Sequence, residues 1–211
     1  MLVIGLTGGI GTGKSEVSRM LQRLGAAVID ADRVGHEVYR PQTSTWHRVV
    51  EAFGEGILAP SGEIDRKKLG SIVFADQRAL ARLNAIVHPV IREELVGRLE
   101  GLRGRGTPVV VVEAAVLIEA GWDTLMDEVW VTHSREDAAV ARVARRNNLS
   151  PEEVRRRVRA QLPFEERRMH ADVVIENDGD LEALRQKVEA LWDSRVKGRS
   201  WKDAGRHSDA V

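Results

Sequence analysis

The 211-residue chain contains no cysteine, which excludes disulfides, thiolate metal sites and cysteine nucleophiles. It also lacks a long apolar run. Its most apolar segment, residues 109–122, is interrupted by Glu113 and Glu119 and falls short of the ~20 apolar residues that a membrane helix needs. The N-terminus lacks the basic region of a secretory signal. We therefore expect a soluble, cytoplasmic protein without a membrane partner.

An excess of charge of one sign is lacking as well, because 32 basic residues are balanced by 32 acidic ones. This balance argues against a broad electrostatic surface for nucleic acid, so we expect no nucleic-acid partner. The length and the 43% of hydrophobic residues suit one main domain with inserted subdomains. The oligomeric state stays open between a monomer and a weak homo-oligomer.

The strongest motif lies near the N-terminus, where residues 8–15 match the pattern G-x-x-x-x-G-K-[ST]. The apolar run before it, residues 3–7, predicts a buried strand, and apolar residues at helical spacing after it predict a helix. Such a loop lets main-chain N–H groups converge on phosphate oxygens. Lys14 would reach the β- and γ-phosphates, and the Ser15 hydroxyl would hold Mg²⁺. A glycine-rich turn that merely precedes a helix is the weaker alternative.

The motif predicts a phosphate-binding site with a magnesium ion, and the family resemblance given below implies that the nucleotide is ATP. Its candidate ATP-binding residues are Gly9, Gly11, Thr12, Gly13, Lys14, Ser15 and Glu16.

Two carboxylates follow the second predicted strand, residues 26–29. In an open α/β sheet, ligands lie beyond the carboxyl ends of the strands, so Asp30 and Asp32 would face the same crevice as the phosphate loop. Either residue would also serve as the cap of the helix expected over residues 33–39. The two interpretations are even for Asp30, whereas catalysis is favoured for Asp32, because one cap does not need two acids.

From residue 41 to about 102 the pattern is helical, without a convincing buried strand, and predicts an inserted helical region. Asp65 is a predicted N-cap, and Pro89 is placed to open a new helix near its first position. His88, directly before Pro89, is a candidate contact to the acceptor. A lone histidine more often serves packing or capping.

Three further strands are expected at residues 109–112, 129–131 and 173–175. Glu113 ends the first of them, a weak Walker-B-like signal in which an apolar strand delivers a carboxylate near Mg²⁺, with contact through a bound water. Five strands alternating with helices imply the α/β class with a mostly parallel five-stranded sheet and right-handed crossovers.

Ten arginines and six acids lie between Arg135 and Arg168. For any individual arginine, a solvated, ion-paired helical face is the simpler interpretation. Phosphoryl transfer, however, needs cations over the γ-phosphate as charge spreads in the transition state. We therefore predict a lid, in which Arg146, one helical turn beyond Arg142, contacts the γ-phosphate.

Together, the motifs resemble those of the dephospho-coenzyme A kinase family over roughly residues 2–192. The segments that carry the resemblance are residues 5–15, Val28-Ile29-Asp30-Ala31-Asp32, His88-Pro89-Val90-Ile91, Arg142 with Arg146, Arg157-Val158-Arg159-Ala160-Gln161 and Ala171-Asp172-Val173-Val174-Ile175-Glu176-Asn177. The chain departs from the family at residues 113–119, where Glu replaces the family's first Asp and its proline is missing. Glu16 also stands where the family commonly has Ser or Thr.

The resemblance implies a kinase that uses ATP to phosphorylate the ribose 3′-hydroxyl of dephospho-CoA, the last step of CoA biosynthesis. It implies that Asp32 is the base, that Thr7 and His88 lie near the acceptor, and that Asn177 belongs to the ATP site. The lid arginines that it implies are Arg142, Arg146 and Arg157, with Arg157 near the acceptor.

The family fold is a P-loop kinase core with a helical acceptor-binding region and a lid. The expected division is residues 1–40, 104–134 and 171–193 for the core, 41–103 for the acceptor-binding region, 135–170 for the lid and 194–211 for a flexible tail. Another P-loop kinase of a nucleotide or of shikimate is the alternative enzyme. A regulatory GTPase is disfavoured because no Asn-Lys-x-Asp motif is present, and RNA binding is disfavoured by the interleaved acids.

Overall fold

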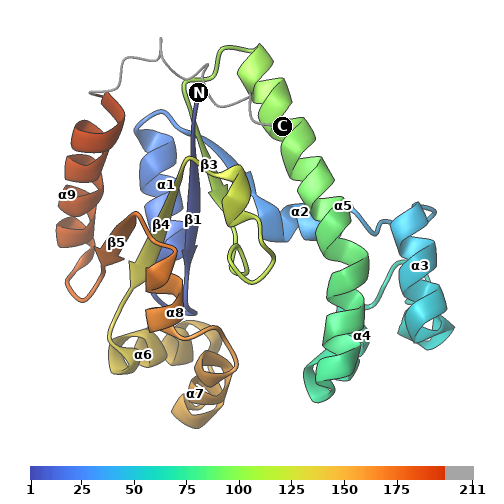
Figure 1. Ribbon diagram of the computed structural model, residues 1–211. Coiled ribbons are helices and arrows are strands. Elements are labelled where there is room, and N and C mark those ends of the chain that lie inside the picture. The colour runs from blue at the N-terminus through green and yellow to red at the C-terminus, as the bar shows by residue number, and fades with distance from the viewer. Residues whose placement is uncertain (198–211) are drawn as a thin grey trace. The chain divides into compact units, whose positions relative to one another are not determined.

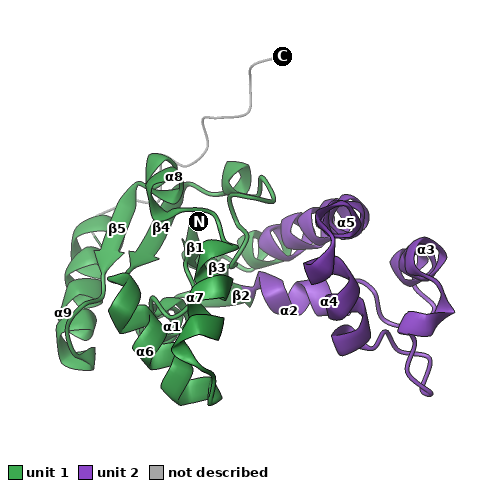
Figure 2. Cartoon of the chain, turned by 90° about the horizontal axis from the view of Figure 1, so that it is seen from below, with its two compact units in different colours: residues 1–29, 101–211 green, residues 30–100 purple. Residues whose placement is uncertain are grey.

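The computed structural model describes residues 1–197 and divides the chain into two compact units (Figures 1 and 2). The first unit comprises residues 1–29 together with the chain from residue 101 onward, and the second comprises residues 30–100. The second unit therefore includes residues 30–40, which the expected division places in the core. The assignment of functions to these regions stays a prediction.

A five-stranded sheet forms the centre of the first unit (Figure 1). Its spatial order is β2-β3-β1-β4-β5, and the pairs β1–β3, β1–β4 and β4–β5 are parallel. The predicted α/β class with a parallel sheet is confirmed, and each predicted strand is present within a residue or two. The strands are β1 (Leu2–Gly8), β2 (Ala27–Asp30), β3 (Val109–Glu113), β4 (Glu128–His133) and β5 (Val173–Glu176).

The main core packs one face of this sheet against helices α1 (Lys14–Arg23) and α9 (Leu181–Trp192) (Figure 1). Alternate residues of β1, Leu2, Ile4 and Leu6, face this core, as the two-residue period of a strand requires. The other helices of the unit are α6 (Glu136–Asn147), α7 (Pro151–Arg159) and α8 (Phe164–Met169), with a 3-10 turn, η2 (Asp123–Leu125).

The chain continues past α9 as a π-helical turn, η3 (Asp193–Lys197). Val196 in this turn is buried in the main core, so residues 194–197 are held by packing and differ from the flexible tail expected from Ser194 onward. Three of these four residues are polar, so the sequence pattern did not indicate that Val196 would pack in the core. The rest of the expected tail, residues 198–211, lies outside the described residues.

The second unit is helical, as expected. Its elements are α2 (Ala31–Glu37), α3 (Ser44–Phe53), η1 (Glu55–Ile57), α4 (Arg66–Ala75) and most of α5 (Gln77–Gly104). The Asp65 side chain accepts hydrogen bonds from the backbone N–H groups of Lys67 and Lys68, which confirms the predicted cap of α4. No helix within residues 1–197 is long and apolar enough to cross a membrane.

The prediction that Pro89 opens a new helix is wrong, because α5 runs through it without interruption. Proline in a helix interior removes a backbone hydrogen bond and costs about 3 kcal/mol or more. An apolar stripe at four-residue spacing continues across it, since Val87, Ile91, Leu95 and Leu99 are all buried. Burial along this stripe outweighs the lost hydrogen bond and keeps the helix in one piece.

Candidate active site

The loop between β1 and α1 carries the phosphate-binding motif, and its shape depends on glycine at two positions. Gly13 has a φ of +98°, and a Cβ atom there would come within 2.3 Å of Asn177 Nδ2. Gly11 has a φ of +79°, and a Cβ atom there would lie 2.6 Å from the carbonyl oxygen of Ala139. Residues with a side chain rarely adopt such φ values. Glycine thus lets the loop pack directly against α6 and the segment after β5.

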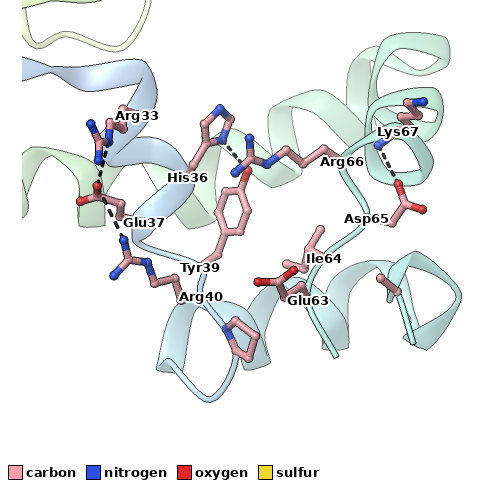
Figure 3. A pocket seen from close by; sticks show the side chains of 12 residues that line it. Arg33, His36, Glu37, Tyr39, Arg40, Glu63, Ile64, Asp65, Arg66 and Lys67 are labelled. Carbon is pink, nitrogen blue, oxygen red and sulfur yellow. Dashed lines mark hydrogen bonds and ion pairs between the residues drawn. The ribbon is translucent and has the colours of Figure 1, made fainter. Parts of the chain in front are cut away.

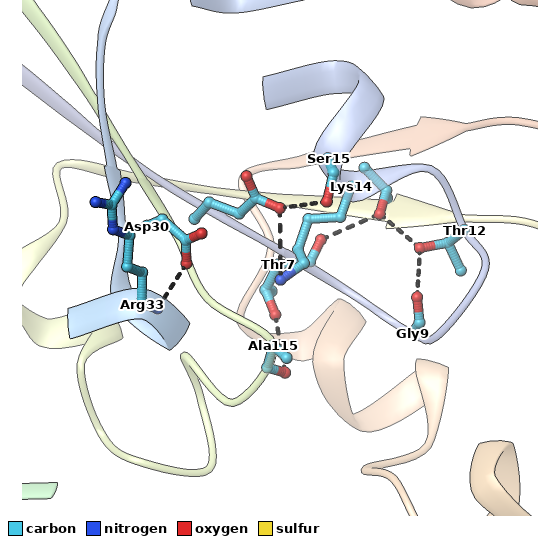
Figure 4. Close-up of polar contacts among 10 residues, drawn as sticks. Thr7, Gly9, Thr12, Lys14, Ser15, Asp30, Arg33 and Ala115 are labelled. Carbon is cyan, nitrogen blue, oxygen red and sulfur yellow. Dashed lines mark hydrogen bonds and ion pairs between the residues drawn. The ribbon is translucent and has the colours of Figure 1, made fainter. Parts of the chain in front are cut away.

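Side chains of Asn177 and Thr12 hold the loop from within. Asn177 Nδ2 donates to the Thr12 carbonyl oxygen at 2.9 Å. Thr12 Oγ1 donates to the Gly9 carbonyl oxygen at 2.8 Å and shares a hydrogen bond of 2.7 Å with Thr132 Oγ1 (Figure 4). These bonds fix the loop before any ligand arrives, which is the preorganisation that a phosphate cradle needs.

Glu113 reaches Lys14 and Ser15 at the start of α1, and Figure 4 labels the latter two. Ser15 Oγ donates to Glu113 Oε1 at 2.7 Å, and Lys14 Nζ lies 3.7 Å from the same oxygen. The Lys14 and Glu113 side chains are only 13% and 12% exposed. The structure therefore brings the predicted strand-end carboxylate to the two motif residues that would meet phosphate and metal. Glu16, one residue further, forms an ion pair with Arg19 on the helix surface.

This arrangement fits Mg²⁺. A serine hydroxyl and a carboxylate are hard oxygen ligands, and Mg²⁺ in kinases is commonly bound through one or two protein oxygens together with substrate phosphates. Ser15 Oγ and Glu113 Oε1 already lie within 2.7 Å of each other. No group of three or more His, Cys, Asp or Glu side chains that would form an all-protein cage occurs in residues 1–197.

Asp30 and Asp32 have different environments at the start of α2. The Asp30 side chain accepts a hydrogen bond of 3.0 Å from the backbone N–H of Arg33 and is the N-cap of the helix (Figure 4). Asp32 lies in the first helical turn with its side chain exposed. For Asp30, therefore, the capping interpretation is the one that the structure supports.

Two of the predicted acceptor contacts belong to different units. Thr7, near the end of β1, is fully buried, and its hydroxyl donates to the Ala115 carbonyl oxygen at a long 3.5 Å (Figure 4). His88 lies in the middle of α5 and is half-buried. Contact of either residue with an acceptor stays a prediction.

The three predicted lid arginines differ in their surroundings. Arg142 is half-buried and donates to Ser134 Oγ and to the Asn177 carbonyl oxygen, both at 2.8 Å, so it ties α6 to the loop after β5. Arg157 is exposed and pairs with Glu153 one turn away, as in the simpler ion-paired interpretation. Arg146 is exposed, and its Nε donates to Asn147 Oδ1 at 3.0 Å.

Two residues that the sequence analysis did not predict as site residues lie beside the phosphate loop. Gln161 Oε1 accepts a hydrogen bond of 2.7 Å from the backbone N–H of Ile10. Arg167 is buried and, with Gln161 and Gly9, lines a cavity of about 420 Å³. The sequence indicates Gln161 only through its place at the end of the family-like segment 157–161. It does not distinguish Arg167 from the other nine arginines between residues 135 and 168.

A second cavity, of about 690 Å³, lies within the second unit (Figure 3). His36 Nδ1 and Tyr39 Oη share a hydrogen bond of 3.1 Å, with Arg66 beside them (Figure 3). Burial, and then the charge of Arg66, lower the pKa of His36, whereas burial raises the pKa of Tyr39. A hydrogen bond from Arg98 lowers the pKa of the neighbouring Glu37 carboxyl. The basic side chains that line this cavity are Arg33, His36, Arg40, Arg66 and Lys67.

Comparison with known proteins finds a matching family, similar sequences and similar solved structures. The model of the dephospho-CoA kinase family matches residues 2–183. A dephospho-CoA kinase from Geobacter sulfurreducens is 52% identical over 195 residues, which cover 92% of this chain and 99% of that protein. The solved structure of a dephospho-CoA kinase from Campylobacter jejuni is 27% identical, with a TM-score of 0.70 over 93% of this chain and 98% of that one.

A more distant likeness shows how widely the fold is used. A shikimate kinase from Acinetobacter baumannii, solved in complex with shikimate, is 20% identical, with a TM-score of 0.53 over 93% of this chain and 96% of that one. At this identity the likeness shows the fold alone. A kinase named for a different acceptor thus shares this fold.

Proposed function

Because this chain belongs to the dephospho-CoA kinase family, we propose that it transfers the γ-phosphoryl group of ATP to the ribose 3′-hydroxyl of dephospho-CoA, the last step of CoA biosynthesis. The family match over residues 2–183 carries this proposal. The convergence of Lys14, Ser15 and Glu113 at the phosphate loop supports it, because these groups suit a nucleoside triphosphate with its metal.

The donor site is the better defined half. The main-chain N–H groups of residues 9–15 would cradle the β- and γ-phosphates, with Lys14 as the point charge on the transferring group. Ser15 would bind Mg²⁺ directly and Glu113 through a water. The bound ion would supply charge neutralisation on the phosphate oxygens. Glu113 would also stay close enough to Lys14 to orient its ammonium group.

Asp32 is the proposed general base. Its carboxylate would accept the proton of the 3′-hydroxyl as the new bond to phosphorus forms and the bond to the ADP oxygen breaks. One observation supports this choice over Asp30: the Asp30 side chain accepts the hydrogen bond that caps α2.

For the acceptor, we propose Thr7, His88 and Arg157 as contacts, together with the cavity beside α2. Dephospho-CoA carries a diphosphate, and Arg66 and Lys67 in that cavity form no ion pair with any described residue. Cationic side chains in a concave site are suited to phosphate oxygens. In this proposal, the diphosphate of the acceptor binds in the cavity of the second unit.

Arg142, Arg146 and Arg157 would belong to a lid that spans residues 135–170 and closes over ATP. Arg146 would leave Asn147 on closure and reach the γ-phosphate. The protein would act in the cytoplasm as a monomer or weak homo-oligomer, on small molecules and without nucleic acid, in keeping with its balanced charge.

A coupled assay that compares acceptors tests the activity. Purified protein with ATP and Mg²⁺ is offered dephospho-CoA, adenosine, nucleoside monophosphates or shikimate, and ADP formation is followed. We expect dephospho-CoA to give the highest kcat/KM, with phosphate found on the 3′-oxygen of the product. A higher kcat/KM for shikimate or for a nucleoside monophosphate would overturn the proposal in favour of another P-loop kinase.

A further inference from the structure

Arg167 is an arginine with an unusual environment. Its side chain is 4% exposed, and charged side chains are rarely buried unless they are paired and hydrogen-bonded. Its Nη2 atom donates to Glu119 Oε1 at 3.1 Å. Its Nε atom is buried without a hydrogen-bond partner among residues 1–197. Folding has therefore buried a cation with one donor group left unsatisfied, which calls for an explanation.

The guanidinium faces the first turn of the phosphate loop. A Cβ atom added to Gly9 would lie 3.5 Å from Arg167 Nη1, so guanidinium and loop backbone are near neighbours. Both residues line the same cavity of about 420 Å³, which also contains Ile10 and Gln161. This volume is sufficient for a phosphate group, and the loop backbone on its wall is of the type that binds phosphate.

Gln161 occupies one main-chain donor of the phosphate loop. Its Oε1 atom accepts the hydrogen bond of the Ile10 N–H at 2.7 Å, and that N–H belongs to a loop whose main-chain donors serve phosphate oxygens. A neutral amide oxygen thus occupies a position where an anionic oxygen would accept a stronger, charge-assisted bond. Arg167 lines the same cavity and carries a positive charge. A neutral amide does not require a cation beside it, whereas a phosphate group is stabilised by one.

We propose that Arg167 is a further catalytic residue, which binds the γ-phosphate of ATP at Gly9 and Ile10 after Gln161 has given up the Ile10 N–H. Glu119 is a positioning residue that holds the guanidinium in place. This inference rests on the proposed kinase function. During transfer, the bond from the γ-phosphorus to the bridging oxygen breaks and the bond to the acceptor oxygen forms, while Arg167 stabilises the charge on the equatorial oxygens.

Nucleotide binding without any acceptor tests this placement independently of the acceptor's identity. Calorimetry measures the Kd of Mg²⁺ complexes of ADP and of a non-hydrolysable ATP analogue for the wild type, Arg167→Lys and Arg167→Gln. We expect the Kd of the analogue to rise about tenfold in Arg167→Gln and less in Arg167→Lys, with ADP changed less than about twofold. The exposed neighbour provides the control: Arg168→Gln should change neither Kd.

Kinetics and a second variant complete the test. Arg167→Gln should lower kcat by about 10²–10³-fold, a typical cost of one transition-state donor. Gln161→Glu leaves the buried ion pair intact, so it should fold even if Arg167→Gln does not. Its carboxylate should weaken binding of the ATP analogue but not of ADP, because it would repel the γ-phosphate. Equal losses for both nucleotides, or wild-type kcat in Arg167→Gln, would overturn the role of Arg167 at the γ-phosphate.

Failure of the proposal is distinguishable from failure of the kinase function. If the wild type binds both nucleotides but neither variant separates them, the placement of the γ-phosphate is wrong and the kinase function stands. If the wild type binds neither nucleotide, the kinase proposal itself fails and Arg167 fails with it.

Discussion

The phosphate loop and the cavity beside α2 hold their charged groups in different ways. Around the loop, Arg167 is buried and Lys14 and Glu113 are largely shielded from solvent, and ion pairs hold all three side chains. In the cavity of the second unit, the Arg66 and Lys67 side chains are exposed and extend from the first turn of a surface helix. The first environment preorganises charge, and the second presents charge on exposed side chains.

This difference predicts that the loop mainly affects the chemical step and the cavity mainly affects acceptor binding. A buried, fixed charge stabilises a transition state strongly, because little solvent screens it and no reorganisation is needed. An exposed charge attracts a ligand but is screened, so it contributes mainly to binding. Substitutions near the loop should therefore lower kcat, and substitutions in the cavity should raise the KM of the acceptor.

Asp32→Asn has the largest expected effect. Asp32 belongs to the second unit, so a large loss of kcat would be an exception to the rule that substitutions in this unit mainly raise the KM. The substitution keeps the size of the side chain and removes its basicity, so kcat should fall by about 10²–10⁴-fold while ATP binding changes little. Asp30→Asn is the matched control, since asparagine caps a helix about as well as aspartate. If Asp30→Asn abolishes turnover and Asp32→Asn does not, the base is Asp30.

Lys14→Ala tests the expected effect of the phosphate loop on kcat. Loss of the point charge on the transferring phosphoryl group should lower kcat by about 10²–10³-fold or more. Thermal unfolding should be close to that of the wild type, because glycine and Asn177 hold the loop. Lys197→Ala, a lysine paired with Asp193 on the surface, should leave kcat unchanged. A kcat near that of the wild type in Lys14→Ala would contradict the phosphate-loop assignment.

Arg146→Ala tests the proposed lid. If Arg146 reaches the γ-phosphate on closure, kcat should fall by about tenfold or more while the KM for dephospho-CoA changes less, since the contact strengthens as transition-state charge develops. Arg145→Ala, the exposed neighbour, serves as the control. Wild-type kcat in Arg146→Ala would leave Arg146 as a surface residue bonded to Asn147.

Arg66→Gln tests the cavity. Loss of a charge-assisted contact to the diphosphate should raise the KM for dephospho-CoA by up to about tenfold, with kcat and the KM for ATP unchanged. The control is Arg78→Gln, an exposed arginine outside the cavity lining. A change in kcat alone would contradict the proposed division between binding and chemistry.

The smallest expected effect is a pH dependence from His36. Burial and Arg66 lower its pKa, so His36 is neutral at pH 7 and gains a proton only at a pH below its usual value of 6.5. Protonation would add positive charge to the cavity, so the KM for dephospho-CoA should fall by a few-fold as the pH drops below about 6, and the change should disappear in His36→Gln.

Folding stability changes in the opposite direction. The unfolded chain binds a proton at His36 more readily than the folded one, so the contribution of His36 to stability should decrease as the pH falls below 6.5. Thermal unfolding at pH 7 and pH 5.5 measures this change, and His36→Gln should reduce it. An equal decrease in both proteins would assign it to other groups.

Much of the donor site follows from local pattern. The glycines, Lys14 and Ser15 of the loop are contiguous, and a strand before and a helix after them constrain how they can fold. The Asp65 cap and the five strands are also local features, readable from capping chemistry and from short apolar runs.

The features that were missed depend on which residues the packed chain buries. Pro89 indicated a helix start locally, but burial of Val87, Ile91 and Leu95 decided that α5 continues. Arg167 and Arg157 look alike in the sequence, yet one is buried with Glu119 and the other is an exposed pair on its own helix. Burial is a property of the packed chain and has no signature in a single arginine.

The sequence alone therefore determined the phosphate loop, because a contiguous motif places main-chain donors, Lys14 and Ser15 through backbone geometry that a few residues specify. Tertiary structure decided which side chains share an environment: Glu113 with Ser15 and Lys14, Gln161 with Ile10, and Arg167 with Glu119. These partners are separated by up to 151 residues, and only the packing of the strands and helices brings them within hydrogen-bond distance.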